Sequence, residues 1–331
     1  MCETLIVDAA GLADLDYDRL AAEWLRSLRG SRSQVAFSRR LRYRSNIAYL
    51  WESGRNWPTA ARALWAAERT GVDVRGRLRG LFHTVPGWLD ELDPASPEGV
   101  VYLMRELRGS TPVVEVAGRM GRSRFAVARW LKGTAQPRLP DFFRFIEAAS
   151  LRLLDFIALF GDPSELEAAR PRWAQLEAAR RLSQQEPWSQ AVFLALELHD
   201  YRALDTHRGG WIATRVGVSR ETEETCLALL EQAGQIRRDD AGRWEVVRSQ
   251  TVDTRRAGVS GAKLWWSEMA AKRIQEGAPG SFAYNVFSVS REDLERLKEM
   301  QRQYFRSVRS VVADSKPSEC IAVMNLQLFE L

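Results

Sequence analysis

Apolar residues in the first half of the chain recur every three or four positions in short runs, the spacing typical of amphipathic helices. One run spans residues 113–120, and a second spans residues 124–132. Gly121 lies between them, where a residue without a Cβ suits a tight turn, and Ser123 can cap the second helix through its hydroxyl. The pattern predicts two short helices joined by a brief turn.

The same arrangement occurs earlier in the chain, displaced by 79 positions without a gap, so that residues 38–58 align with residues 117–137. Arg42 aligns with Gly121, which costs about 1 kcal/mol if the backbone there is left-handed. We therefore predict two copies of one helical unit. Identical pairs include Leu28 and Leu107, Gly30 and Gly109, Val35 and Val114, Arg40 and Arg119, Trp51 and Trp130, Gly54 and Gly133, and Pro58 and Pro137.

A different pattern follows between residues 187 and 250. A turn at Gly217 separates a short apolar helix from a longer helix over 219–233. Two short β-type runs then flank the turn at 239–242, which is typical of a hairpin. Two helices followed by a hairpin predict a winged-helix module.

The charge of this predicted module argues against contact with a polyanion. The first turn of its longer helix holds Glu221, Glu223 and Glu224 against a single Arg220. Carboxylates that face phosphates raise the energy of approach. We expect a structural or protein-contacting role for this part.

The C-terminal residues 251–331 combine two predicted helices, over 262–277 and 291–315, with two predicted strands, over 281–290 and 319–331. Two strands around one long helix cannot cover both faces of a sheet within one chain. A partner surface is therefore expected, and a second copy of the chain is the simplest one.

Basic residues are concentrated in two blocks that coincide with the repeats. Residues 26–79 carry thirteen arginines and three acidic residues, and residues 105–152 carry ten basic and four acidic residues. Residues 161–331 are almost neutral, with 24 basic and 25 acidic residues. Such blocks suit a nucleic-acid backbone, because neutralising phosphates releases condensed counterions. A basic helix face can also be merely solvated, so charge alone does not decide.

Composition favours a folded cytoplasmic protein of two or three domains, because 331 residues with 45% hydrophobic content exceed one ordinary core. The N-terminus does not resemble a signal peptide, and no stretch approaches the ~20 apolar residues that cross a bilayer. Cys2, Cys226 and Cys320 lie far apart, which favours neither a disulfide framework nor a zinc site.

Enzymatic motifs are not recognisable. His199, Asp200, Asp205 and His207 lie close together, but their spacing matches no metal motif. The chain has no glycine-rich phosphate loop and no arrangement that indicates a nucleophilic triad. We expect neither enzymatic activity nor a cofactor or metal ion.

Both repeats resemble the lambda-repressor-like, or XRE-type, helix-turn-helix family. That family has a Gln before an apolar-Ala pair, an apolar-Gly-Val-Ser turn, and a Trp-Glu-x-Gly ending followed by Pro. The resemblance implies that the second helix of each unit enters the DNA major groove. The first copy matches at Gln34, Phe37, Ser38, Leu41, Trp51, Glu52, Gly54 and Pro58, and the second at Val116, Ala117, Met120, Gly121, Ser123, Trp130, Gly133 and Pro137.

The same resemblance assigns expected contacts to individual residues. Arginine can bond both major-groove acceptors of guanine, and asparagine can do the same with adenine, whereas phosphate contacts only fix register. Trp51 and Trp130 are expected in the core. Expected base-reading residues are Arg44, Ser45, Asn46 and Tyr49 in the first copy and Ser123, Arg124, Phe125 and Arg129 in the second, with Gln34 in support and Arg39, Arg40, Arg55, Arg122 and Lys132 on phosphates.

From residue 187 onward the chain resembles an uncharacterised bacterial regulator family. Its members join an N-terminal helix-turn-helix to a C-terminal domain of unknown function and end in Asn-Leu-Gln-Leu-Phe-Pro-Leu. Residues 325–331 read Asn-Leu-Gln-Leu-Phe-Glu-Leu, with Glu330 in place of proline, and "WIATRVG" at 211–217 and "FSVSRE" at 287–292 also fit. The resemblance implies transcriptional control and supplies no effector.

We therefore predict a mainly α protein with tandem helix-turn-helix repeats, a winged-helix module and a small α+β C-terminal domain. The expected domains are a first helix-turn-helix domain over 1–80, a second over 81–164, a helical linker over 165–186, the winged-helix module over 187–250 and a dimerisation or sensing domain over 251–331.

The expected function is that of a sequence-specific regulator of transcription, most simply a repressor, which binds double-stranded DNA and associates with the nucleoid when bound. A homodimer through the C-terminal half would present four reading heads, so its operator should be long or bipartite. Two alternatives remain open at this point. The repeats could serve as docking surfaces for another protein, or the C-terminal half could sense a small-molecule or peptide effector.

Overall fold

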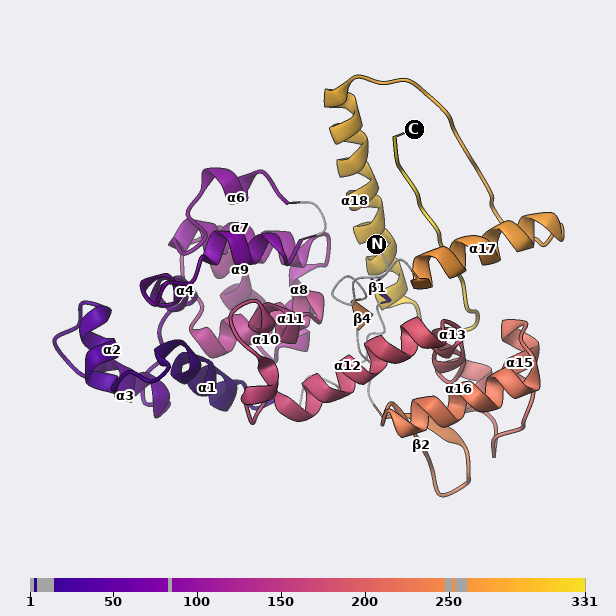
Figure 1. Ribbon diagram of the computed structural model, residues 1–331, viewed down its shortest axis with the longest axis horizontal. Coiled ribbons are helices and arrows are strands. Elements are labelled where there is room, and N and C mark those ends of the chain that lie inside the picture. Colours follow the sequence, from indigo (N-terminus) through magenta and orange to yellow (C-terminus); the bar gives the residue numbers. More distant parts are fainter. Residues whose placement is uncertain (1–2, 5–14, 83–84, 248–251, 254–260, 331) are drawn as a thin grey trace. The chain divides into compact units, whose positions relative to one another are not determined.

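The computed structural model describes residues 3–4, 15–82, 85–247, 252–253 and 261–330, and these residues are mainly helical (Figure 1). Two antiparallel pairs of short strands are the only sheets in the described ranges. The predicted mainly α class is confirmed. The chain divides into two compact units, one within residues 9–174 and one formed by residues 175–331 with the N-terminal strand. Among the described helices, none is long and apolar enough to cross a membrane.

The N-terminal unit contains two successive sets of five helices, with one short helix between them. The first set is α1 (Tyr17–Arg29), α2 (Gln34–Arg40), α3 (Ile47–Glu52), α4 (Ala60–Arg69) and α5 (Val74–Arg79). After α6 (Trp88–Glu91), the second set is α7 (Pro97–Arg108), α8 (Val113–Arg119), α9 (Arg124–Lys132), α10 (Leu139–Ser150) and α11 (Leu153–Ala158). The 3₁₀ helix η2 (Pro163–Glu165) and α12 (Arg170–Gln185) lead into the second unit.

Equivalent helices of the two sets occupy matching positions 79 residues apart. α2 and α8 begin and end at matching residues, and so do α5 and α11. Left-handed glycines match as well, with φ 61° at Gly30 and 57° at Gly109, and φ 71° at Gly54 and 79° at Gly133. The spacing of the sequence repeat is thus also the spacing of the helices and of their turns.

The turn after α2 keeps its shape without its glycine. Arg42 has φ 59°, and the aligned Gly121 has φ 62°. An L-residue in this left-handed region costs roughly 1 kcal/mol, because its Cβ approaches the backbone. The Arg42 side chain is exposed, so it meets no crowding beyond its own backbone.

One core serves both sets of helices. Trp24 of α1 contacts Phe143 of α10 and Phe160 edge to face, with ring centroids 5.8 and 5.6 Å apart. α1 packs on α10, and the equivalent α7 packs on α4. The first helix of each set therefore lies on the fourth helix of the other set. The described residues of the two predicted domains, 1–80 and 81–164, consequently share one compact unit, except for the N-terminal strand, which belongs to the other unit.

The second unit begins with helices around a small apolar core. They are α13 (Trp188–Ala195), α14 (His199–Arg202), α15 (Trp211–Val216) and α16 (Arg220–Gln232), followed by the antiparallel hairpin β2 (Ile236–Arg238) and β3 (Trp244–Val246). The Asp239 carboxylate accepts the N–H groups of Ala241 and Arg243, at 3.0 and 2.8 Å, and closes the hairpin turn. A second pair of strands is β1 (Glu3–Thr4) with β4 (Val252–Asp253).

The C-terminal part contains α17 (Gly261–Gln275) and α18 (Arg291–Asp314). Trp265 and Trp266 of α17 meet Trp188 of α13, with ring centroids 4.6 and 5.7 Å apart, and attach α17 to the core of the unit. Asn325 reaches back to the same helix, where its Nδ2 donates to the carbonyl of Trp266 at 2.9 Å.

The two strands predicted at 281–290 and 319–331 are wrong for the residues that the structure describes. Residues 281–290 and 316–330, which precede and follow α18 in the chain, are extended but form no strand (Figure 1). A strand requires a neighbour for its backbone N–H and C=O groups, and among the described residues no strand pairs with either segment. Alternation of apolar residues predicted the extended backbone but could not supply the neighbour.

Candidate nucleic-acid interface

α9 presents an exposed cationic surface in the N-terminal unit. Its inner face is held by the buried Val127, Trp130 and Leu131. Ser123 caps it, because its Oγ accepts the N–H of Ala126 at 3.2 Å, and Gly133 ends it in the left-handed conformation. The cap, the core face and the terminating glycine fix the helix from both ends and leave the opposite face open.

The open face of α9 carries an exposed stripe. Phe125, Arg129 and Lys132 are four and three positions apart and therefore lie on one side of the helix. Phe125 is 68% exposed, and the guanidinium of Arg124 lies 4.9 Å from the centroid of its ring. We define these four residues, Arg124, Phe125, Arg129 and Lys132, as the α9 stripe.

No carboxylate neutralises the α9 stripe within the part of the chain that the structure describes. The helix itself, Arg-Phe-Ala-Val-Ala-Arg-Trp-Leu-Lys, contains no acidic residue. Arg124, Arg129 and Lys132 are exposed, and none of them forms an ion pair with a described residue. Three cations and one aromatic ring are thus available to a ligand.

Arg122, just before α9, is differently placed. Its Nε and one terminal nitrogen donate to the carboxylate of Asp141 on α10, at 2.9 and 2.7 Å. The aligned positions in the first set are also joined, because Nε of Arg62 donates to the hydroxyl of Tyr43 at 2.9 Å. Both pairs tie the turn to the fourth helix, so Arg122 serves the fold before it can serve a phosphate.

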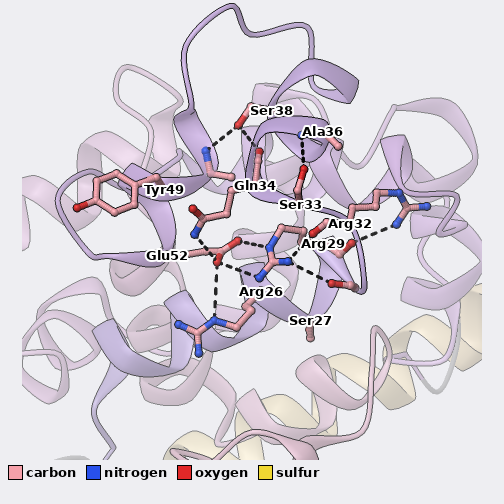
Figure 2. A network of polar contacts seen from close by, with 12 residues as sticks. Arg26, Ser27, Arg29, Arg32, Ser33, Gln34, Ala36, Ser38, Tyr49 and Glu52 are labelled. Atoms are coloured by element: carbon pink, nitrogen blue, oxygen red, sulfur yellow. Dashed lines mark hydrogen bonds and ion pairs between the residues drawn. The ribbon is translucent and has the colours of Figure 1, made fainter.

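The first set has a buried carboxylate at its centre, which Figure 2 shows. Glu52 is 9% exposed, and its oxygens accept from Nε of Arg29 at 2.6 Å and from Nε2 of Gln34 at 3.0 Å. Nε of Arg26 lies 3.7 Å away from the same carboxylate. A buried charge is tolerated when it is paired and hydrogen-bonded in this way. The predicted supporting role of Gln34 at DNA is therefore limited, because its amide holds Glu52.

Asn46 is also engaged inside the protein. Its Oδ1 accepts the N–H of Tyr49 at 3.4 Å and caps α3, and the hydroxyl of Ser38 lies 3.2 Å from the same oxygen. Bidentate recognition of adenine needs both the oxygen and the nitrogen of the amide. Asn46 cannot cap α3 and read adenine in this way at the same time.

Arg40 has a structural partner that recurs in the second set. Its Nε donates to the carbonyl of Arg69 at the end of α4, and Arg119 donates to the carbonyl of Ala148 at the equivalent place in α10, at 3.0 Å. Both arginines satisfy carbonyls that a helix end leaves open. The predicted phosphate contact of Arg40 thus competes with a role in the fold.

The remaining predicted residues of the first set are exposed. The side chains of Arg39, Arg44 and Ser45 form no hydrogen bond or ion pair with another described residue, so their polar groups face solvent. The guanidinium of Arg55 lies 5.2 Å from the centroid of the Tyr49 ring. These residues form a second cationic surface, whose aromatic ring, Tyr49, is 42% exposed against 68% for Phe125 in the α9 stripe.

Two further residues belong to this picture although neither was predicted as a site residue. Arg42 is exposed beside Arg39 and Arg44 in sequence, and its alignment with a turn glycine was the signal that it faces outward. Glu52 organises the inner side of the first set, and its being the only acid between residues 26 and 67 was the corresponding signal.

The start of α16 in the second unit differs from its prediction. Glu223 is completely buried, and its carboxylate accepts the N–H groups of Gly210, at 3.0 Å, and of Ala213. The count of acidic residues in this turn assumed that Glu223 faces outward. The structure shows that it does not. Glu221 remains exposed, and Glu224 pairs with Arg220 at 2.8 Å.

A chain of hydrogen-bonding groups continues from Glu223. Nε2 of His207 lies 3.5 Å from Glu223, and its Nδ1 lies 3.1 Å from the hydroxyl of Tyr201, which accepts the N–H of Trp244 at 3.2 Å. Burial lowers the pKa of His207 below its ordinary value, although the nearby Glu223 acts in the opposite direction. Burial also raises the pKa of Tyr201 to about 12. The network joins α14, α16 and β3.

No group of three His, Cys, Asp or Glu side chains that could hold a metal ion occurs in the described ranges. The two ring nitrogens of His207 lie near Tyr201 and Glu223. Among the described residues, no contact joins His207 to His199.

Comparison with known proteins gives one match. The profile of a family described as a domain of unknown function (DUF4423) matches residues 172–331, which is nearly the whole of the second unit. No curated protein and no solved structure matches the chain. The α9 stripe lies outside the matched residues.

Proposed function

We propose that the protein is a transcriptional regulator that binds double-stranded DNA sequence-specifically, with α2–α3 and α8–α9 acting as tandem helix-turn-helix units. The α9 stripe is the observation that carries the proposal. It combines two arginines, a lysine and an exposed aromatic ring on the outer face of a capped helix, with no carboxylate on that helix. The proposal places α9 in the major groove, which is wide enough to admit an α-helix.

Roles within the α9 stripe follow from chemistry and position. Arg124 and Arg129 have the planar donors that bond both major-groove acceptors of guanine, and Phe125 has an apolar surface that suits the methyl group of thymine. Lys132, in the last turn, is suited to a phosphate. This assigns base reading to the first two turns of α9 and positioning to its end.

We call the two helix-turn-helix units heads, with α2–α3 as the first and α8–α9 as the second. The two heads are unequal in this proposal. The amide nitrogen of Gln34 and the amide oxygen of Asn46 have partners within the protein, whereas Arg39, Arg44 and Arg55 remain exposed. The first head therefore contributes mainly phosphate contacts, which add affinity without sequence information. The second head contributes most of the specificity.

The second unit joins two chains in this proposal. The extended segments 281–290 and 316–330 leave large apolar side chains exposed, including Tyr284 at 94%, Val286 at 77% and Phe329 at 71%. Unpaired extended backbone beside apolar side chains readily pairs with another chain. We place the homodimer contact here, and α13–α16 with the hairpin act as a winged-helix-like support.

Footprinting on the promoter region beside the protein's own gene tests the proposal. We expect a protected site that is lost, with a decrease in affinity of at least about thirtyfold, in the double variant Arg124→Ala/Arg129→Ala, because each arginine–guanine pair contributes about 1–3 kcal/mol. The double variant Arg181→Ala/Arg208→Ala removes the same charge from exposed positions of the other part of the chain and should retain the footprint. Unchanged binding by the first variant contradicts the assignment of α9.

A second function is favoured by one observation. Val114 on α8 and Phe125 on α9 are 64% and 68% exposed, and exposed apolar side chains are also common in protein docking surfaces. In this alternative the heads bind another protein instead of DNA. The affinity of an association through an apolar surface would change little as the salt concentration rises, whereas the affinity for DNA would fall steeply. A small-molecule or peptide effector of the second unit is compatible with either function.

A further inference from the structure

The two sets of helices meet at one short antiparallel bridge. The N–H of Ala60 donates to the carbonyl of Pro137 at 3.0 Å, and the N–H of Leu139 donates to the carbonyl of Pro58 at 3.0 Å. Thr59 and Arg138 lie opposite each other between these bonds. Thr59 and Arg138 are 79 positions apart. Pro58 and Pro137 are also 79 positions apart, and so are Ala60 and Leu139.

This register has a geometric meaning. Pro58 of the first set bonds the residue equivalent to Ala60 in the second set, and Ala60 of the first set bonds the residue equivalent to Pro58. In an interface with two-fold symmetry, residue i of one copy contacts residue j of the other, and j contacts i. The bridge has this reciprocal pattern within a single chain.

Packing of the helices has the same reciprocity. α1 packs on α10, and their equivalents α7 and α4 pack on each other as well. A screw or translational relation between tandem repeats would place each copy against the next by two different surfaces. The bridge and the two helix pairs instead use the same surfaces twice. The second set is therefore related to the first by a two-fold rotation near Thr59 and Arg138.

We infer that a single chain presents its two heads as an internal two-fold pair, and that its DNA site is an imperfect inverted repeat. This inference rests on the proposed function. Two heads that are related by a two-fold axis and bound to one duplex must meet half-sites that are related by the same axis, and on antiparallel strands this relation gives an inverted repeat. A direct repeat would require heads in the same orientation.

The two half-sites must differ in sequence. At the 79-residue offset, Arg124 corresponds to Ser45 and Phe125 to Asn46. The exposed Arg129 corresponds to the half-buried Leu50 in the first set. The half-site under α9 is therefore read strictly, and the half-site under α3 loosely. A homodimer of the full chain would cover two such inverted repeats, which agrees with a long or bipartite operator.

Selection of duplexes from a random pool by the full-length protein supplies the site, and three probes then test its symmetry. They are the selected site, the same half-sites rearranged as a direct repeat, and the strict half-site alone. We expect the selected site to show inverted symmetry and to bind about a hundredfold more tightly than either other probe, because the second head binds at a high effective concentration. Adding five base pairs between the half-sites, about half a helical turn, should remove this advantage.

Hydroxyl-radical footprints assign the heads. Arg124→Ala/Arg129→Ala should remove protection from the strict half-site first, and Arg39→Ala/Arg44→Ala should remove it from the loose half-site first. Titration should give one chain for each inverted repeat. Equal binding to the direct and inverted arrangements, or tight binding to a single unrepeated site, overturns this inference and leaves the proposed function standing. Failure to bind any duplex at low salt overturns both.

Discussion

At position 42 an arginine occupies a backbone conformation that favours glycine. Arg42 has φ 59°, and the aligned Gly121 shows which residue suits that turn. We predict that Arg42→Gly raises the free energy of unfolding by up to about 1 kcal/mol, because it removes the left-handed strain. The corresponding rise in the midpoint of thermal unfolding is about 2–4 °C.

A matched control separates strain from charge. Arg39→Gly removes an exposed guanidinium three residues earlier, but it places glycine in the last turn of α2 and should destabilise by about 1 kcal/mol. If both variants lower the thermal midpoint equally, the left-handed turn at Arg42 stores no strain.

Phe125 offers a second test at the level of one side chain. If its ring meets a thymine methyl in the selected site, replacing that thymine by deoxyuridine should weaken binding by about 0.8 kcal/mol, the cost of one buried methyl group. Phe125→Ala should make the protein insensitive to the same replacement. Val114→Ala, also an exposed apolar position, should retain the sensitivity, and its loss in both variants would contradict the contact.

The positions of the site residues were only partly predictable. The resemblance to the helix-turn-helix family placed Arg124, Phe125 and Arg129 on the outer face of α9, whereas helical spacing alone left Phe125 or Ala126 available for packing. The partners of Gln34 and Arg40 could not be found in this way, because Glu52 and Arg69 lie 18 and 29 positions away along the chain. A long polar side chain is exposed or engaged according to tertiary contacts that local patterns do not contain.

Among the elements of the second unit, the network of His207 links α14, α16 and β3. Because burial lowers the pKa of His207, the unfolded chain takes up this proton at a higher pH than the folded chain does. The contribution to stability is therefore complete above about pH 6.5, the ordinary pKa of histidine. It is lost as the pH falls from that value through the lowered pKa of the folded chain.

We predict that the midpoint of thermal unfolding of the wild-type protein falls more steeply between pH 7 and pH 5 than that of His207→Gln. The amide can keep hydrogen bonds to Tyr201 and Glu223 but does not titrate. His199→Gln, at an exposed histidine eight residues earlier, should leave the slope unchanged. Equal slopes for the wild-type protein and His207→Gln would contradict the role of this network.

Helices were predictable from the sequence, and the C-terminal strands were not. Apolar spacing with the caps Ser219 and Ser290 anticipated α16 and α18 to within a residue or two. The segment 281–290 has the alternation of a strand, yet it lies unpaired. Helices satisfy their own backbone groups, whereas a strand depends on a neighbour, and a single chain need not supply it.

At the scale of the whole molecule, two helical sets with a sequence repeat share one core through reciprocal contacts. The repeat at 79 residues was visible in the sequence, but the pairing of α1 with α10 and of α7 with α4 was not. Both pairs join helices that are far apart in the chain. These long-range helix contacts join the two similar units into one body with an internal two-fold axis.

The C-terminal segments give a prediction for assembly. We expect the full-length protein to sediment as a dimer and the double variant Tyr284→Asp/Val286→Asp to sediment as a monomer, because charge on these exposed side chains opposes burial in an interface. Gln303→Asp, at an exposed position of α18, should remain dimeric. A wild-type protein that stays monomeric at micromolar concentrations would contradict a dimer through this part.

The salt dependence of duplex binding tests the central claim most directly. With the selected duplex, the logarithm of the affinity of the full-length protein should fall linearly with the logarithm of salt concentration, losing roughly a thousandfold between about 50 and 200 mM if about six phosphates are neutralised. Lys132→Ala should reduce the slope by about one, as expected for the loss of one phosphate contact. An affinity that hardly changes with salt, or no binding at about 50 mM, would contradict the proposal that these helices bind DNA.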